Sequence, residues 1–373
     1  MEVLALILKH YYIVGMTLVS LIGIGWLPSA ASAMSAQEPT ICLDAGHQQY
    51  GNNKLEPVGP GSTEMKAKVS SGTRGVQTKK PEYVLNLEAS VLMQRKLEDL
   101  GYKVITTRDT HNVDLSNKER ANVCNQANAD LALRIHADGD TSPQTKGLSV
   151  LYPAQSGYSQ NIYSSSKAAA QHVLEEAVKA SGASSRGIIP RSDLSGFNWS
   201  EVPTILLEMG FMSNPEEDKK LSDPEYLERL AQGVVKGINH YFAVEPEGTL
   251  MESDDRVYLP DDSRLYELVD GQLIRTSLAL SAQTVQTSAV RGSWSQVNTW
   301  VGERWVYTGQ APVGVSSLDI YLELSQDTPM YVSPLDRTPL AELSPQKVYA
   351  YEKWKDWFLI KTWLGGVWIK PSN

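Results

Sequence analysis

Short strand-like segments and longer helix-like segments alternate along residues 40–242, and this alternation constrains the fold more than any other feature of the chain. Short apolar runs are typical of buried strands, whereas longer segments with apolar residues at helical spacing predict helices. The strand candidates are 40–43, 103–107, 131–135, 147–152 and 204–207, and the helix candidates are 81–100, 115–128, 164–180 and 224–242. This order predicts an α/β domain over residues 39–243, with an open, mostly parallel sheet flanked by helices.

The beginning of the chain has the composition of an export signal. Lys9 precedes the nearly uncharged apolar run Tyr11–Trp26, and small residues at Ala31 and Ala33 match the A-x-A pattern of a cleavage site. An uncleaved membrane anchor is the alternative, but the run is shorter than the roughly 20 residues that cross a bilayer. We therefore expect a signal peptide over residues 1–33 and a secreted mature protein without a stable membrane span.

Composition argues against two further classes of protein. Asp and Glu total 43 against 34 for Lys and Arg, and this net charge of −9 without a basic stripe makes nucleic acid an unsuitable partner. The two cysteines, Cys42 and Cys124, are too few for a disulfide scaffold. Export permits a bridge between them, but each lies in an apolar stretch, so we expect two buried thiols packed as small hydrophobic groups.

An internal repeat follows a linker-like segment at 244–256. The segment Trp294–Val306 aligns with Trp357–Ile369 at a constant offset of 63 residues. We therefore expect two small all-β, barrel-like modules, at 257–310 and 316–373. Their Trp-x-x-Val/Ile-x-Thr-Trp-x-Gly pattern resembles bacterial Src-homology-3-like modules.

Seven of the nine Trp residues lie in this repeated tail. Exposed Trp rings would form aromatic platforms for wall glycan or peptide, whereas buried ones would form the cores of small barrels. We expect most to be core and a minority to serve binding. The modules are then predicted to bind cell wall, in a protein that we expect to be monomeric.

Three polar residues stand at the ends of predicted strands. His47 follows strand 40–43, His136 follows strand 131–135, and Glu208 follows the last strand of the predicted sheet. One such histidine is more often a hydrogen-bonded loop residue than a ligand. Ligands bind at the carboxyl ends of strands in open α/β sheets, however, so three polar residues there indicate a functional site.

A further carboxylate falls among apolar residues of the first predicted helix. Val84, Leu87, Val91 and Leu92 form a stripe at helical spacing, and Glu88 lies within it. A carboxylate on a buried stripe needs a salt bridge or a metal ion. Taken alone, the salt bridge is the better interpretation.

Two histidines and one carboxylate form the donor set of a catalytic zinc ion with an open fourth position. His47, Glu88 and His136 are therefore candidate metal ligands, and Glu208 is a candidate proton carrier for metal-assisted hydrolysis. The same donors match the facial triad of iron oxygenases. Glu208, the export signal and the repeated tail favour hydrolysis.

The motifs around these residues resemble those of the zinc N-acetylmuramoyl-L-alanine amidases of the third amidase family. They are Leu-Asp-Ala-Gly-His47, Asn-Leu-Glu88, Thr107-Arg108-Asp109, Glu119-Arg120-Ala121-Asn122, Arg-Ile-His136-Ala and Leu-Leu-Glu208-Met-Gly-Phe-Met-Ser-Asn-Pro. The resemblance covers residues 39–242. It implies one zinc ion on His47, Glu88 and His136, and Glu208 as the catalytic carboxylate. It also implies a cell-wall hydrolase, or autolysin, that cuts the amide between N-acetylmuramic acid and L-alanine in peptidoglycan.

Three positions near the ligands are open to interpretation. Arg134 and Asp138 flank His136 where the family often has Ser and Asn, which affects the expected substrate contacts but no ligand. Asp44 either orients a ligand imidazole or caps a loop.

Two other functions share these features. A zinc peptidase that cuts peptide cross-links would use the same chemistry, so the triad does not exclude it. A non-catalytic wall-binding protein would be expected to lose a ligand or the proton-carrying carboxylate, and this chain retains all four.

Overall fold

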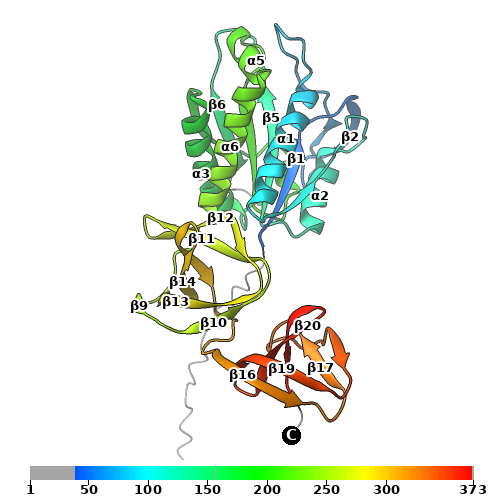
Figure 1. Ribbon diagram of the computed structural model, residues 1–373. Coiled ribbons are helices and arrows are strands. Elements are labelled where there is room, and N and C mark those ends of the chain that lie inside the picture. The colour runs from blue at the N-terminus through cyan, green and yellow to red at the C-terminus, as the bar shows by residue number, and fades with distance from the viewer. Residues whose placement is uncertain (1–37, 156, 372–373) are drawn as a thin grey trace, which may run out of the picture. The chain divides into compact units, whose positions relative to one another are not determined.

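The computed structural model describes residues 38–155 and 157–371, so the predicted signal peptide lies outside the described residues (Figure 1). A six-stranded sheet has the order β4-β1-β5-β8-β6-β7. Its strands are β1 (Thr40–Ala45), β4 (Lys103–Thr106), β5 (Leu131–Asp138), β6 (Leu148–Pro153), β7 (Ser185–Arg191) and β8 (Thr204–Phe211). Only the β6–β8 pairing is antiparallel among the pairs of this sheet, which confirms the predicted mostly parallel sheet.

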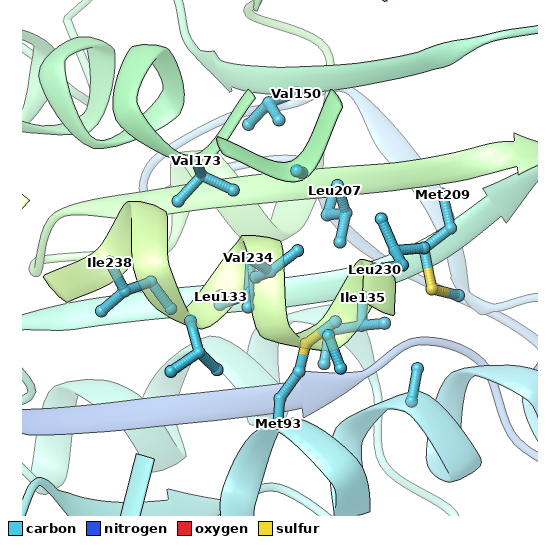
Figure 2. Close-up of a cluster of buried hydrophobic side chains, with 14 of the residues drawn as sticks. Met93, Leu133, Ile135, Val150, Val173, Leu207, Met209, Leu230, Val234 and Ile238 are labelled. Carbon is cyan, nitrogen blue, oxygen red and sulfur yellow. The ribbon is translucent and has the colours of Figure 1, made fainter. Parts of the chain in front are cut away.

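Helices cover both faces of this sheet. Residues of α1 (Glu82–Asp99), α3 (Tyr163–Ser181) and α6 (Pro224–Tyr241) pack on one face, against inward side chains of β5, β6 and β8 (Figure 2). The short helices α2 (Asn117–Gln126) and α4 (Ser195–Asn198) pack on the other face. Side chains alternate along each strand, so Leu133 and Ile135 join the first core while Ala132 faces α2.

The predicted helices 81–100, 115–128, 164–180 and 224–242 correspond to α1, α2, α3 and α6. Sequence patterning missed β7, α4, α5 (Pro215–Leu221) and the hairpin of β2 (Asn52–Pro57) and β3 (Met65–Val69). β2 is polar and carries no apolar alternation, whereas the five residues of β3 do alternate but lie in a stretch that the sequence predicts to be a polar loop. No helix among the described residues is long and apolar enough to span a membrane.

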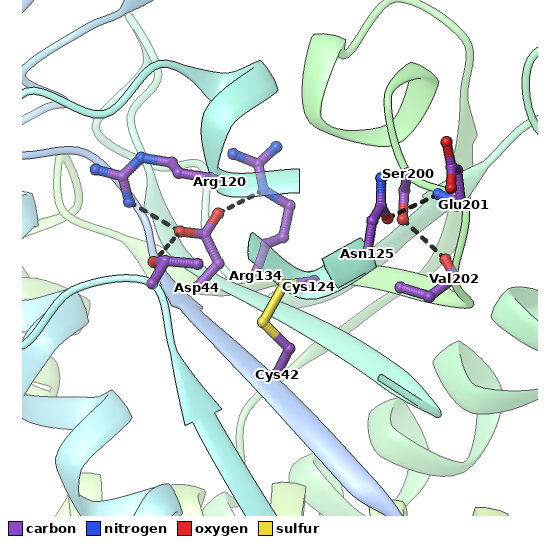
Figure 3. The surroundings of a disulfide bond; sticks show 10 residues. Cys42, Asp44, Arg120, Cys124, Asn125, Arg134, Ser200, Glu201 and Val202 are labelled. Carbon is purple, nitrogen blue, oxygen red and sulfur yellow. Dashed lines mark hydrogen bonds and ion pairs between the residues drawn. A yellow bond between two sulfur atoms is a disulfide. The ribbon is translucent and has the colours of Figure 1, made fainter. Parts of the chain in front are cut away.

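The two cysteines are bonded to each other. Cys42 of β1 and Cys124 of α2 form a disulfide on the face covered by α2 (Figure 3). Both are buried as expected, but the expectation of two free thiols is wrong. The bridge closes a sequence separation of 82 residues, and only the packing of α2 on β1 brings the two sulfur atoms together.

The C-terminal part consists of two antiparallel β-sheets with corresponding strand orders. The first has the order β10-β13-β14-β15-β11-β12 and the second β16-β19-β20-β21-β17-β18, and β9 (Met251–Glu252) of the predicted linker pairs with β13. The first strands are β10 (Arg256–Leu259), β11 (Ser263–Val269), β12 (Gln272–Leu280), β13 (Gln283–Arg291), β14 (Trp294–Thr299) and β15 (Gly302–Tyr307). The second strands are β16 (Ser316–Glu323), β17 (Thr328–Tyr331), β18 (Ala341–Leu343), β19 (Lys347–Trp354), β20 (Trp357–Thr362) and β21 (Gly365–Ile369). The aligned repeats thus occupy equivalent hairpins, β14–β15 and β20–β21.

The disulfide is expected to stabilise the sheet domain. Replacing both Cys42 and Cys124 with Ala should lower the free energy of unfolding by about 2–5 kcal/mol, because the bridge restricts the unfolded chain over a long loop. Urea unfolding of the oxidised protein measures this change. Reductant should destabilise the wild type to a similar extent and leave the double variant unaffected; equal stability of both oxidised proteins would contradict the expectation.

Candidate metal centre

His47 is held at the end of β1 by its backbone and by a loop carbonyl. Its φ of 61° lies in the left-handed region, which is strained for a residue with a side chain. Its Nδ1 lies 2.9 Å from the carbonyl oxygen of Ser70. Donation of an Nδ1 proton to that oxygen leaves Nε2 free to act as a ligand.

Glu82, the first residue of α1, joins the two histidines. Its Oε1 lies 3.1 Å from Nε2 of His47 and 3.2 Å from Nδ1 of His136. Backbone amides of Thr73 and Ala137 donate to its two carboxylate oxygens, at 2.8 and 3.2 Å. This buried carboxylate is thus fixed in place by the neighbouring chain.

These three residues fit a metal ion. Their ligand atoms all lie within 4.8 Å of one another. Two ligands that are each about 2.1 Å from a tetrahedral zinc ion are about 3.4 Å apart, close to the two observed nitrogen–oxygen separations. His47, Glu82 and His136 therefore form a candidate metal site.

Two glycines make room for this cluster. A Cβ atom on Gly46 would lie 2.3 Å from Nε2 of His136, and one on Gly72 would lie 2.5 Å from Oε2 of Glu82. Real Cβ atoms do not approach so closely, so these positions require glycine while the ligands keep their places.

Electrostatics favour the metal-binding protonation states of the cluster. Burial alone would raise the pKa of Glu82, but its hydrogen bonds with His136 and His47 hold that pKa well below the usual range. Burial lowers the pKa of His136 to about 4, although its hydrogen bond with Glu82 opposes this shift. At neutral pH Glu82 is therefore ionised and His136 is neutral, as metal coordination requires.

The structure does not bring Glu88 to the cluster, and Glu82 replaces it as the candidate third ligand. The Glu88 side chain is 44% exposed and forms a 2.7 Å ion pair with Lys80. The stripe of Val84, Leu87 and Val91 lines a surface groove instead of packing into the core.

The direction of α1 explains the difference between the two carboxylates. α1 packs against the strands β1 and β5, and its first residue already touches the histidines at the carboxyl ends of those strands. Glu88 lies six residues further, about 9 Å along the helix axis at 1.5 Å per residue. The sequence feature that could have identified Glu82 as a ligand is its position directly after Pro81, at the start of the predicted helix.

Glu208 is brought to the site as predicted from its place at a strand end. It lies opposite His136 in the parallel register of β5 and β8, and its Oε2 is buried without a hydrogen-bond partner among the described residues. Burial, followed by the charges of Asp138 and Glu82, raises the pKa of Glu208 well above its ordinary value. Burial therefore favours the protonated form of Glu208 more than it would for an exposed carboxyl group.

The ligands and Glu208 line one cleft. The cleft has a volume of about 530 Å³ and is bordered by Ser70, Thr73, Asp138 and Ser213, among other residues. Burial raises the pKa of Asp138, whose carboxylate accepts a hydrogen bond from the amide of Gly139. Asp138 is thus a second carboxyl group in the lining of the cleft that holds Glu208.

Asp44 has a different role from either one considered in the sequence. It is buried beneath the site and accepts hydrogen bonds from Arg120, Arg134 and Thr107, at 2.8, 2.9 and 2.7 Å (Figure 3). Burial alone would raise its pKa, but the two guanidinium groups and Thr107 hold that pKa well below the usual range. Its hydrogen bonds reach no ligand imidazole, and Arg134 is part of this ion cluster rather than of the cleft lining.

Comparisons with known proteins match the sheet domain. The family model described as N-acetylmuramoyl-L-alanine amidase matches residues 41–240. The N-acetylmuramoyl-L-alanine amidase Rv3717 of Mycobacterium tuberculosis is 27% identical over 239 residues, which cover 58% of this chain and 92% of that relative. The probable cell wall amidase LytH of Staphylococcus aureus is 27% identical over 209 residues, 56% of this chain and 60% of that relative. Among solved structures, the N-acetylmuramyl-L-alanine amidase Ami1 of Mycobacterium smegmatis has 27% identity and a TM-score of 0.49, covering 54% of this chain and 96% of its own.

The two carboxylates of α1 allow a direct test of the ligand set. Glu82→Gln should weaken Co²⁺ binding at least about a hundredfold, because even the loss of groups that support ligands costs about 10–100-fold. Glu88→Gln on the same helix should leave binding unchanged. Titration followed by the visible spectrum of Co²⁺ measures both affinities, and equal effects of the two substitutions would count against the revised set.

Proposed function

Because this chain belongs to the N-acetylmuramoyl-L-alanine amidase family, we propose that it cuts the amide between N-acetylmuramic acid and L-alanine in peptidoglycan with one zinc ion on His47, Glu82 and His136. The observation that carries the proposal is the convergence of these three donors and Glu208 on one cleft at the carboxyl edge of the sheet. The family match spans the strands and helices that position all four residues.

The donor set suits hydrolysis by a zinc enzyme. A bound zinc ion would polarise the scissile carbonyl and lower the pKa of water to about 7. Ser70 keeps His47 in the tautomer that ligation needs, and the amides of Thr73 and Ala137 keep Glu82 in place. The chain's own groups thus fix the ligand geometry before substrate arrives.

We assign proton transfer to Glu208. In this role its carboxylate accepts a proton from the attacking water and returns it to the amine that leaves with L-alanine. Its position opposite His136 places it beside the metal ligands, and its unpartnered Oε2 is available to water or substrate. Burial raises the pKa of Glu208, which is the direction of shift expected for a carboxyl group that acts as a general acid and base.

Family membership decides among the functions considered from the sequence. The peptidase, the iron oxygenase and the non-catalytic wall-binding protein each share some residues with this site, but the matched family is an amidase. All four chemical groups are present in the cleft, so the site retains what hydrolysis requires.

The rest of the chain fits a role in the cell wall. The Cys42–Cys124 disulfide suggests an extracytoplasmic protein, since such bridges persist in oxidising compartments. We propose that a signal peptide over residues 1–33 directs export, and that the modules at 257–310 and 316–373, of bacterial Src-homology-3-like type, hold the enzyme on its polymeric substrate.

The bond that is cut can be read from the products. Incubation of purified peptidoglycan with the chain from Met34 onward should release stem peptides that begin with L-alanine, as measured by mass spectrometry. A chelator should stop this release and zinc should restore it. Cleavage within the peptide cross-links would instead assign a peptidase, and the absence of any metal-dependent product would refute the enzymatic function.

The role of Glu208 can be separated from metal binding. Glu208→Gln should lower kcat by about 10²–10⁴-fold, the usual contribution of a general acid–base group, while the bound zinc content stays the same. Glu88→Gln serves as a matched carboxylate control and should retain full activity. Near-normal turnover of the Glu208 variant would show that another group carries the proton.

A further inference from the structure

We propose that Trp300 and Trp363, at the tips of the β14–β15 and β20–β21 hairpins, are the contacts of the two modules with the neutral glycan strands of the wall. This inference rests on the proposed function, in which the modules hold the enzyme on peptidoglycan. It adds the residues and the part of the polymer that they recognise. We call these two residues the hairpin-tip tryptophans.

The repeat separates the tryptophans into buried and exposed positions. Trp305 and its equivalent Trp368 are 3% and 0% exposed and lie in buried clusters, the first with Trp294 and the second with Leu359. The hairpin-tip tryptophans are 68% and 72% exposed. Both modules therefore use one repeat position for packing and leave another large ring in solvent, where it contributes little to the core.

The tip sequence is the same in both modules although the surrounding repeat has diverged. Only five of thirteen aligned residues are identical between Trp294–Val306 and Trp357–Ile369. Three of these five are the Thr, Trp and Gly of the tips, at Thr299-Trp300-x-Gly302 and at the equivalent positions 63 residues later. A requirement for folding alone explains the Thr and Gly but not the exposed ring.

The same hydrogen bonds hold both tips rigid. In the first module the hydroxyl of Thr299 donates to the carbonyl of Gly302 at 2.7 Å and accepts from the amide of Val301 at 3.2 Å. In the second, Thr362 makes the equivalent bonds with Gly365 and Leu364, each at 3.2 Å. A rigid tip presents its aromatic ring with little loss of conformational entropy on binding.

The charge of the modules favours a neutral ligand. Residues 257–373 contain twelve acidic and ten basic residues, so these modules lack the excess of Lys and Arg that binds anionic polymers or anionic lipid. A Trp ring offers a broad apolar face with a polar edge. The flat, carbon-bound hydrogen faces of N-acetylated pyranose rings match that surface, and a polysaccharide repeats them along its length.

Two such contacts on one chain would act together. A single exposed ring gives weak binding, but binding of the first module raises the effective concentration of the second on the same polymer. The two hairpin-tip tryptophans together would then keep the enzyme on the insoluble wall, while each single contact stays weak enough to dissociate.

Cosedimentation of the full mature chain with purified peptidoglycan tests the proposal. Trp300→Ala and Trp363→Ala should each weaken binding about fivefold, the effect expected for an interface anchor. The double variant should lose at least about twentyfold, because the gain from bivalency is lost as well. Phe at both positions should bind between the wild type and the double Ala variant, because an aromatic face remains.

Tyr321→Ala is the control for loss of an exposed aromatic ring outside the β20–β21 hairpin, since Tyr321 is 66% exposed and lies on β16 of the second module. It should bind like the wild type. All variants should hydrolyse a small soluble muropeptide at the wild-type rate, which separates failure of the wall contact from failure of the proposed catalytic function.

Soluble oligomers of N-acetylglucosamine should compete with wall binding of the wild type. Undiminished binding of the double Ala variant, or no competition by these oligomers, would overturn the proposal. The wild type could instead bind phosphatidylglycerol vesicles, and the double Ala variant could lose that binding while it still binds peptidoglycan. This result would overturn the proposal in favour of a membrane contact.

Discussion

The buried carboxylate of Asp44 is the constraint on which the catalytic end of the sheet depends. It neutralises two buried guanidinium groups, those of Arg120 and Arg134. Loss of one member of such a cluster leaves an unpaired buried charge, which costs about 3–5 kcal/mol. Arg120 also donates to the carbonyl oxygens of Ala45 and His47, so the cluster helps to hold the chain where it leaves β1 and where the candidate ligand His47 lies.

The strand register arranges the site in successive rows on one face of the sheet. Cys42 lies opposite Ala132, Asp44 lies opposite Arg134, and His136 lies opposite Glu208. A disulfide, an ion cluster and the pair formed by the candidate ligand His136 and Glu208 therefore follow one another toward the carboxyl edge. Since each row limits the movement of the next, the ligands are held in place by covalent and ionic contacts beneath them, which is the support that a preorganised site needs.

In each of the two C-terminal sheets, at least one tryptophan is buried and one at a hairpin tip is exposed to solvent. Trp305 and Trp368 are buried, but each lies in an aromatic cluster separate from the aliphatic core of its module. The two sheets have equivalent strand orders, so these residues occupy equivalent strands, β15 and β21. Exposure of Trp300 and Trp363 is then a property of the hairpin tips and not a failure of packing.

The sequence by itself determined the mostly parallel sheet and the repeat, because the periods of strands and helices are local properties of the chain. It also determined the three strand-end residues His47, His136 and Glu208, because parallel strands end at one edge of a sheet. It did not determine the third ligand. α1 carries apolar residues on two faces, and only its packing on the sheet decides that Glu82 meets the histidines while Glu88 remains exposed. The disulfide was decided in the same way, since the contact between β1 and α2 is set by tertiary packing and leaves no periodic signal in the chain.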